Sequence, residues 1–205
     1  YYIAGDFWLL EAGEGAMKTI IKARKTAMPR CIILTPLYAG EELPWIAPQP
    51  GDFLICADGG WARARQFGLT PQLVVGDFDS MPPAMRPDVP TLTLPTEKDD
   101  TDLVVCLHEG RKRGYTEFIL AGAIGGRFDH TLSCLQCAAD CALRGERAWL
   151  VDGQNRATIL APGTHHLPKM PGRKLSLLAY SPEVRDVTPV SYTHLQAHET
   201  TLHLV

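Results

Sequence analysis

The strongest constraint on the fold is an alternation of short apolar runs with amphipathic segments across residues 28–152. The apolar runs have the length of buried strands, and the segments between them repeat their apolar residues at helical spacing. Strands alternating with helices build parallel sheets that are covered on both faces. This region is therefore predicted to be an α/β domain with a mostly parallel sheet flanked by helices. The predicted strands are 31–35, 53–57, 73–77, 91–94 and 117–123, and the predicted helices are 60–67, 100–113 and 128–144.

The pattern changes near residue 147. Three further strands, at 148–152, 157–161 and 174–180, are separated by Gly and Pro turns and have no helix between them. A run of short strands with such turns is typical of an all-β unit. The chain is therefore predicted to continue into a small, sandwich-type β domain over residues 153–190.

The two ends differ from this middle part. Residues 1–27 are interpreted as an N-terminal extension of uncertain origin, because Met28 followed by an apolar strand is a more natural start; a short amphipathic arm is the alternative. Residues 191–205 are interpreted as an atypical tail of foreign or misjoined sequence, because they do not continue the strand pattern. The histidines of this tail also have a spacing that metal ligands on one helical face would show, but no carboxylate-rich context supports such a site.

Composition excludes several classes of protein. Hydrophobic residues make up 45% of the 205 residues and charged residues 21%, which is typical of a folded chain. The formal net charge is -3, so there is no basic surplus of the kind that nucleic-acid binding requires. No apolar run approaches the roughly 18 residues of a membrane-spanning helix. No segment resembles a signal peptide, and a reducing, cytoplasmic location is predicted.

Three of the six cysteines, Cys134, Cys137 and Cys141, lie on one face of a predicted helix. Small apolar side chains in a core explain this spacing. An iron–sulfur or zinc site is the alternative, but no fourth ligand stands at a recognised distance in the sequence.

Polar side chains follow several predicted strands, at the ends where an open α/β sheet binds its ligands. Asp58 follows the strand at 53–57, and Gly59 and Gly60 allow the backbone to approach a ligand closely. An ordinary Asp-Gly turn is the alternative explanation for this first cluster.

A second cluster, GDFDS, follows the next strand. Asp77 and Asp79 are two residues apart, so their side chains point the same way in an extended chain. Two adjacent carboxylates repel each other unless a cation lies between them. Mg²⁺ takes oxygen ligands and keeps positions open for phosphate oxygens, so a magnesium site is predicted; a solvated acidic turn is the alternative.

A third cluster, EKDDTD, opens the predicted helix at 100–113. Free backbone N–H groups at a helix N-terminus favour anions. Thr101 or Asp99 would cap the helix, and Lys98 supplies a positive charge that reaches a phosphate. Asp102 is predicted to turn inward as a further metal ligand.

A fourth cluster, GAIGGRFDH, connects the strand at 117–123 to the next helix. Its glycines allow backbone amides to face phosphates, and its arginine adds a bidentate donor. The cluster contains neither GK[ST] nor GxGxxG, so alone it is a weak signal. The residues assigned to this loop are Gly122, Gly125, Gly126, Arg127, Asp129 and His130.

Together the clusters supply acids for a metal, glycines for phosphates and basic side chains for charge neutralisation, which indicates a nucleotide–Mg²⁺ transfer site. ADGG, GDFDS, K-D-x-T-D and G-A-x-G-G-R-x-D-H, in this order and spacing within residues 53–130, resemble the thiamine pyrophosphokinase family. The likeness extends over roughly 28–190 and is specific because all four motifs occur together.

The resemblance implies a homodimer whose α/β domain, 28–152, binds ATP and Mg²⁺ and carries out catalysis. It implies transfer of pyrophosphate from ATP to the hydroxyl of thiamine, giving thiamine diphosphate and AMP. The implied catalytic residues are Asp77, Asp79, Asp102 and Lys98, with Asp79 or Asp102 as the expected proton acceptor. The implied Mg²⁺ ligands are Asp58, Asp77, Asp79 and Asp102. The implied nucleotide contacts are Asp58, Gly59, Gly60, Asp99, Thr101, Gly122, Gly125, Gly126, Arg127, Asp129 and His130.

The chain departs from the family pattern after residue 190. The strands and the late Ser-Asn motif expected there, on the thiamine-binding side, are replaced by the tail. The ATP half of the site is expected to be complete and the thiamine half shortened. Three other functions stay open: a related diphosphotransferase for another alcohol such as a pterin, a nucleotide-binding module without catalysis, and a Mg²⁺-dependent phosphohydrolase.

Overall fold

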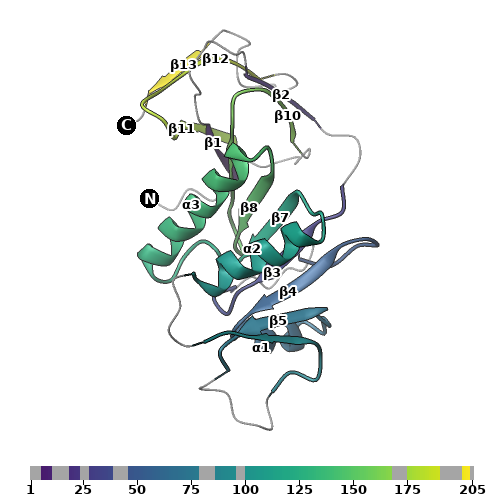
Figure 1. Ribbon diagram of the computed structural model, residues 1–205. Coiled ribbons are helices and arrows are strands. Elements are labelled where there is room, and N and C mark those ends of the chain that lie inside the picture. The colour runs from purple at the N-terminus through teal and green to yellow at the C-terminus, as the bar shows by residue number, and fades with distance from the viewer. Residues whose placement is uncertain are drawn as a thin grey trace.

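The computed structural model describes residues 6–10, 19–23, 28–38, 46–78, 86–95, 100–167, 175–189 and 200–203 (Figure 1). The described strands form two sheets. In spatial order, the larger sheet contains β11 (Leu175–Ala179), β1 (Asp6–Leu10), β9 (Arg156–Leu160), β8 (Arg147–Val151), β7 (Glu117–Ala121), β3 (Cys31–Leu34), β4 (Phe53–Ala57), β5 (Leu73–Gly76) and β6 (Thr91–Thr93). The smaller sheet contains β10 (Thr164–Leu167), β2 (Thr19–Ala23), β12 (Glu183–Pro189) and β13 (Thr200–His203).

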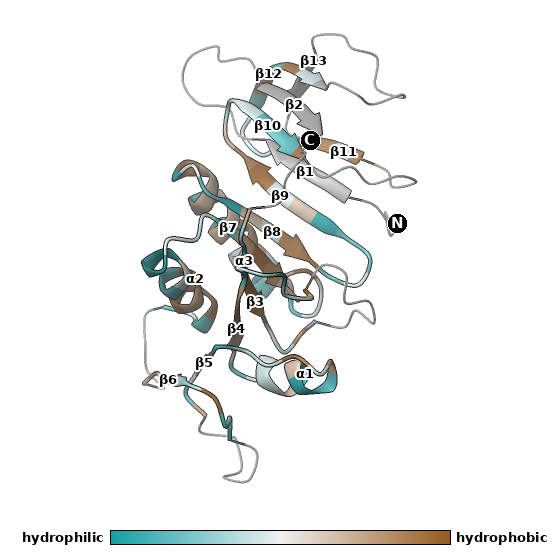
Figure 2. Cartoon of the chain, turned by 90° about the vertical axis from the view of Figure 1, so that its right-hand side faces the viewer, coloured by the Kyte–Doolittle hydropathy of each residue, from teal (hydrophilic) through white to brown (hydrophobic). Residues whose placement is uncertain are grey.

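The predicted parallel sheet is confirmed. Every pairing from β8 across to β6 is parallel. All four residues of the central strand, β3, are buried, because helices cover the sheet on both faces. Figure 2 shows apolar residues concentrated in β3, β4 and β7, as this burial requires.

The three predicted helices are confirmed as α1 (Gly60–Gln66), α2 (Asp102–Lys112) and α3 (Phe128–Leu143). Helix α1 packs on one face of the sheet through Trp61 and Ala64. Helices α2 and α3 pack on the other face, and Figure 2 shows α1 and α2 on opposite sides of the sheet. Within the described ranges, no helix is both long enough and apolar enough to cross a membrane.

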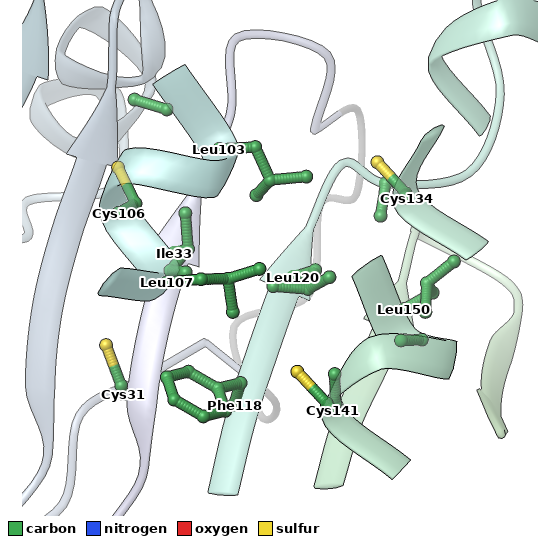
Figure 3. Close-up of a cluster of buried hydrophobic side chains, with 14 of the residues drawn as sticks. Cys31, Ile33, Leu103, Cys106, Leu107, Phe118, Leu120, Cys134, Cys141 and Leu150 are labelled. Atoms are coloured by element: carbon green, nitrogen blue, oxygen red, sulfur yellow. The ribbon is translucent and has the colours of Figure 1, made fainter. Parts of the chain in front are cut away.

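The six cysteines are all free, and five of them are buried. Figure 3 shows Cys31 and Cys106 near Phe118 and Leu107, and Cys134 and Cys141 on α3. These side chains belong to the apolar cluster between the sheet and the helices α2 and α3. The described residues contain no group of three potential ligands that would hold a metal ion.

The buried thiols are expected to resist alkylation in the folded protein. Burial raises the pKa of Cys31, Cys56, Cys134 and Cys141 to about 12 from 9.0. A shift of that size lowers the thiolate fraction at pH 8 roughly a thousandfold, and the thiolate is the reactive form. Counting alkylated thiols by mass spectrometry should show slow labelling of partly exposed Cys137 alone, and six labelled thiols in denaturant. Rapid labelling of any buried cysteine under native conditions would contradict this packing.

The predicted all-β region after residue 152 is confirmed, and it includes strands from the N-terminal part of the chain. Strand β9 pairs antiparallel with β8, and β1 lies between β9 and β11. Strand β2 lies between β10 and β12. Residues 1–27, interpreted as an extension, thus contribute one strand to each sheet. The boundary predicted at residue 152 lies in the turn between two paired strands and stays a prediction; of the tail at 191–205, only β13 is described.

Candidate active site

The order of the strands places the candidate site beyond the carboxyl ends of the parallel strands in the large sheet. The chain leads from β3 to β4, β5 and β6 on one side, and then crosses over to β7 and β8 on the other. The strand order therefore reverses between β3 and β7. In parallel sheets of this kind, ligands bind beyond the carboxyl ends of the strands at such a reversal.

Asp58 and Asp77 follow the carboxyl ends of two neighbouring strands, β4 and β5. The backbone N–H of Asp58 donates to the carbonyl of Val75 at 2.7 Å. A Cβ on Gly76 would lie only 3.1 Å from the Asp58 Cα and 3.4 Å from its Oδ1. The glycine thus lets the two strand ends approach, and it brings the Asp58 carboxylate next to the residue that precedes Asp77.

The backbone after β5 turns sharply. Phe78 has φ +56°, in the left-handed region, so the chain is not extended between Asp77 and Asp79. The expectation that these two side chains point the same way, as on a strand, therefore loses its basis at Phe78. Asp79 itself lies outside the described residues. Asp58 also has a positive φ, +45°, and such strained residues gather at functional sites.

The two glycines after Asp58 have steric functions in the structure. Gly59 is the residue before α1, and a Cβ there would lie 3.1 Å from the Pro36 side chain. A Cβ on Gly60 would lie 2.0 Å from the carbonyl oxygen of Leu34. These glycines therefore allow α1 to begin directly against the end of β3.

Helix α2 also begins at the carboxyl ends of the parallel strands, because it follows β6 in a crossover connection. Thr101 is its N-cap, and the Thr101 hydroxyl accepts a hydrogen bond from the N–H of Val104 at 3.4 Å. Asp102 stands in the first turn. The capping prediction for Thr101 is confirmed, whereas Lys98 and Asp99 lie outside the described residues.

The glycine-rich loop connects β7 to α3. Gly122, Gly125 and Gly126 have φ values of +84°, +95° and +66°, which residues with a side chain rarely adopt. Arg127 is the N-cap of α3, and its side chain makes no capping hydrogen bond. The loop therefore presents backbone at the N-terminus of a long helix, where an anion is favoured.

The charged residues of this loop are exposed and paired with each other. The Arg127 Nε donates to Asp129 Oδ1 at 3.1 Å. The Arg127 guanidinium holds the pKa of the Asp129 carboxyl below its usual value, and the backbone N–H of His130 adds to this effect. Because exposed ion pairs are weak, a phosphate can replace Asp129 as the partner of Arg127.

His130 points inward, toward the start of the loop. Its Nε2 lies 3.2 Å from the carbonyl oxygen of Gly122 and 3.6 Å from Cys134 Sγ. In this position the imidazole contacts the backbone at the start of the loop.

These strand ends and loops lie in a segment that matches a known family. Residues 49–150 match the family model described as "Thiamin pyrophosphokinase, catalytic domain". By this match, residues 49–150 belong to the thiamin pyrophosphokinase family. The resemblance in the motifs is thereby confirmed, and the matched segment contains β4 to β8 almost entirely.

Individual relatives agree with this family. A thiamine pyrophosphokinase of Bacillus subtilis is 25% identical over 163 residues, covering 77% of this chain and 72% of that protein. A thiamin pyrophosphokinase family protein from Enterococcus faecalis has a solved structure that is 28% identical with a TM-score of 0.51. The Bacillus subtilis enzyme structure, 24% identical with a TM-score of 0.51, shows the same fold. In each of these two structures, 63% of this chain is matched to 63% of the solved chain, which is less than two thirds of its length.

The described carboxylates fit one part of a magnesium site. Asp58 and Asp77 follow adjacent strand ends and would supply oxygen ligands, which Mg²⁺ prefers. Asp58, Asp77 and Asp102 do not form a cluster of three potential ligands among the described residues. The four-carboxylate set therefore stays a prediction that includes Asp79.

One polar residue at the carboxyl ends of these strands was not among the site residues predicted from the sequence. Thr35 follows β3 directly, is buried, and donates from its hydroxyl to the carbonyl of Gly122 at 3.2 Å. A polar residue at the end of an entirely apolar run, CIILT, is the signal in the sequence that indicates such a position.

Proposed function

We propose that this member of the thiamin pyrophosphokinase family transfers the pyrophosphoryl group of ATP to the hydroxyl of thiamine, giving thiamine diphosphate and AMP. The observation that carries the proposal is the position of the catalytic-domain match, 49–150. That segment contains the acidic strand ends, the N-terminus of α2 and the glycine-rich loop. These features follow the carboxyl ends of the parallel strands, where a nucleotide would bind.

In the proposed site, basic side chains and backbone amides bind the phosphates, and acidic side chains bind the metal ion. The glycine-rich loop and Arg127 receive the phosphates, and Lys98 adds a second positive charge. Asp58, Asp77, Asp79 and Asp102 would hold Mg²⁺, which neutralises charge on phosphate oxygens during transfer. Asp79 or Asp102 accepts the proton of the alcohol as its oxygen attacks the β-phosphorus and AMP leaves. Most of the acceleration comes from positioning and electrostatics, since phosphoryl transfer asks for little covalent chemistry from the protein.

The remaining parts of the proposal concern assembly and location. A homodimer in the cytoplasm is proposed, with thiamine bound against the β region at 153–190. Size-exclusion chromatography with light scattering measures the assembly, and a mass of 22.5 kDa in solution would contradict the dimer.

The affinity for ATP is expected to fall at least roughly tenfold when Mg²⁺ is removed. Without a cation, the carboxylates of Asp58 and Asp77 stand near the site of a polyanionic ligand and repel it. Calorimetric titration with ATP, in Mg²⁺ and in excess EDTA, measures both affinities. Equal affinity under the two conditions would contradict the proposed metal site.

The test of the function is AMP release from ATP and Mg²⁺, with and without thiamine. Thiamine-dependent AMP, matched by an equal amount of thiamine diphosphate, is the expected result. AMP that appears only with a pterin alcohol would assign the related diphosphotransferase. Hydrolysis that does not depend on thiamine would assign a phosphohydrolase, and ATP binding without turnover would assign a nucleotide-binding module.

A further inference from the structure

Thr35 joins the end of β3 to the end of β7 at the point where the strand order reverses. Its backbone N–H donates to the carbonyl of Ala121 at 3.0 Å. Its hydroxyl donates to the next carbonyl, that of Gly122, at 3.2 Å. The Thr35 side chain is buried, with 3% of the residue exposed. Two successive carbonyls at the start of the glycine-rich loop are thus held by one residue of another strand.

Gly122 has two further hydrogen-bond contacts, and there is no room for a side chain at its α-carbon. Its N–H donates to the carbonyl of Val151 at 2.8 Å, and its carbonyl also lies 3.2 Å from His130 Nε2. A Cβ on Gly122 would lie 2.3 Å from Thr35 Oγ1 and 2.5 Å from the backbone nitrogen of Tyr38. The Thr35 hydroxyl therefore packs directly against the α-carbon about which the loop turns, at φ +84°.

The bond from Thr35 does more than satisfy a buried carbonyl. His130 already lies within hydrogen-bond distance of the Gly122 oxygen, so that oxygen keeps a partner when the Thr35 hydroxyl is removed. What the hydroxyl adds is a second direction of restraint, from β3. Two restraints from different elements define the orientation of the peptide group that leads into the loop.

We propose that Thr35 is a positioning residue that sets the glycine-rich loop, residues 122–127, in its ATP-binding conformation through the Gly122 carbonyl. The proposal rests on the proposed function, in which this loop receives the phosphates. In this role Thr35 acts through the loop and not by contact with the reacting atoms. Its removal is expected to weaken ATP binding and leave thiamine binding unchanged.

The first experiment measures amide hydrogen exchange at Gly122 and Ala123. Thr35→Val keeps the size of the side chain and removes the donor, and Thr35→Ser keeps the donor. Exchange at the two amides is expected to be roughly tenfold faster in Thr35→Val and close to wild type in Thr35→Ser. If Thr35→Val does not fold, the smaller Thr35→Ala serves as the variant without a hydroxyl. Unchanged exchange in the folded variant would overturn the proposal.

The matched control is Thr158→Val. Thr158 is buried in β9, and its hydroxyl donates to the carbonyl of Ala148 at 2.8 Å, so it loses the same kind of bond away from the loop. Thr158→Val is expected to lower stability to a similar degree without faster exchange at Gly122. Equal acceleration in both valine variants would mean general loosening and would overturn a positioning role.

The second experiment measures ATP binding in Mg²⁺ by calorimetry and the KM values for both substrates. Thr35→Val is expected to raise the Kd and KM for ATP roughly 5- to 10-fold, with the KM for thiamine unchanged and Thr35→Ser within about twofold of wild type. A fall in kcat/KM equal for both substrates would overturn the proposal. If the wild type shows no thiamine-dependent AMP release, the proposed function fails, and the exchange at Gly122 still supports or overturns the role of Thr35.

Discussion

Replacing Asp58 with asparagine is expected to reduce thiamine-dependent AMP release by roughly 100- to 1,000-fold. The substitution removes one negative charge from the strand ends that would hold Mg²⁺ and leaves the shape of the side chain almost unchanged. Asparagine also tolerates the left-handed backbone, φ +45°, that residue 58 adopts. The loss is therefore expected in activity and not in folding.

Two further measurements separate the charge from the fold. The free energy of unfolding of Asp58→Asn, from urea denaturation, is expected to stay within about 1 kcal/mol of the wild-type value. Asp88→Asn is the control, because Asp88 is exposed and precedes β6. It therefore lies at the amino-terminal end of this strand, away from the carboxyl ends where the site is proposed. Asp88→Asn is expected to keep full activity. An Asp58→Asn variant with wild-type turnover would contradict the assignment of Asp58 to the metal site.

Replacing Gly60 with alanine is expected to lower the free energy of unfolding by about 3 kcal/mol or more. The new methyl group would lie 2.0 Å from the Leu34 carbonyl oxygen and 2.9 Å from the Leu34 carbonyl carbon. Leu34 belongs to β3, which is buried and paired on both sides, so its backbone cannot move away. Helix α1 would have to shift, and the turn after Asp58 would shift with it.

Gly68, which follows the same helix, provides the control for this substitution. It has φ +65° and nothing within 4 Å of an added Cβ, so Gly68→Ala is expected to cost only about 1 kcal/mol. Urea denaturation of both variants measures the difference. Losses of equal size would show that the contact between Gly60 and Leu34 does not govern stability here.

The described residues agree with some of the local predictions for the site and remove the basis of others. Thr101 caps α2 as its sequence position indicated, because capping is a local interaction. The side chains of Asp77 and Asp79 were expected to point the same way, because an extended backbone was assumed. Phe78 lies between them and has a left-handed backbone conformation, which the pattern of apolar residues does not reveal. His130, assigned to the nucleotide loop, lies within hydrogen-bond distance of the Gly122 carbonyl, a contact that its place in the sequence does not reveal. Local spacing shows which side chains are near one another in sequence, but not the direction in which a turn points them.

The sequence by itself determined the helices and the described strands of residues 28–152, and it placed acids and glycines at the strand ends. Both follow from local patterns: apolar periodicity, capping residues and the spacing of acids and glycines. Only the tertiary structure decided the order of the strands, the insertion of β1 between β9 and β11, and the contact of Thr35 with Gly122 across 87 residues. The physical reason is that strand pairing joins distant segments through backbone hydrogen bonds and shared burial, which no local pattern encodes.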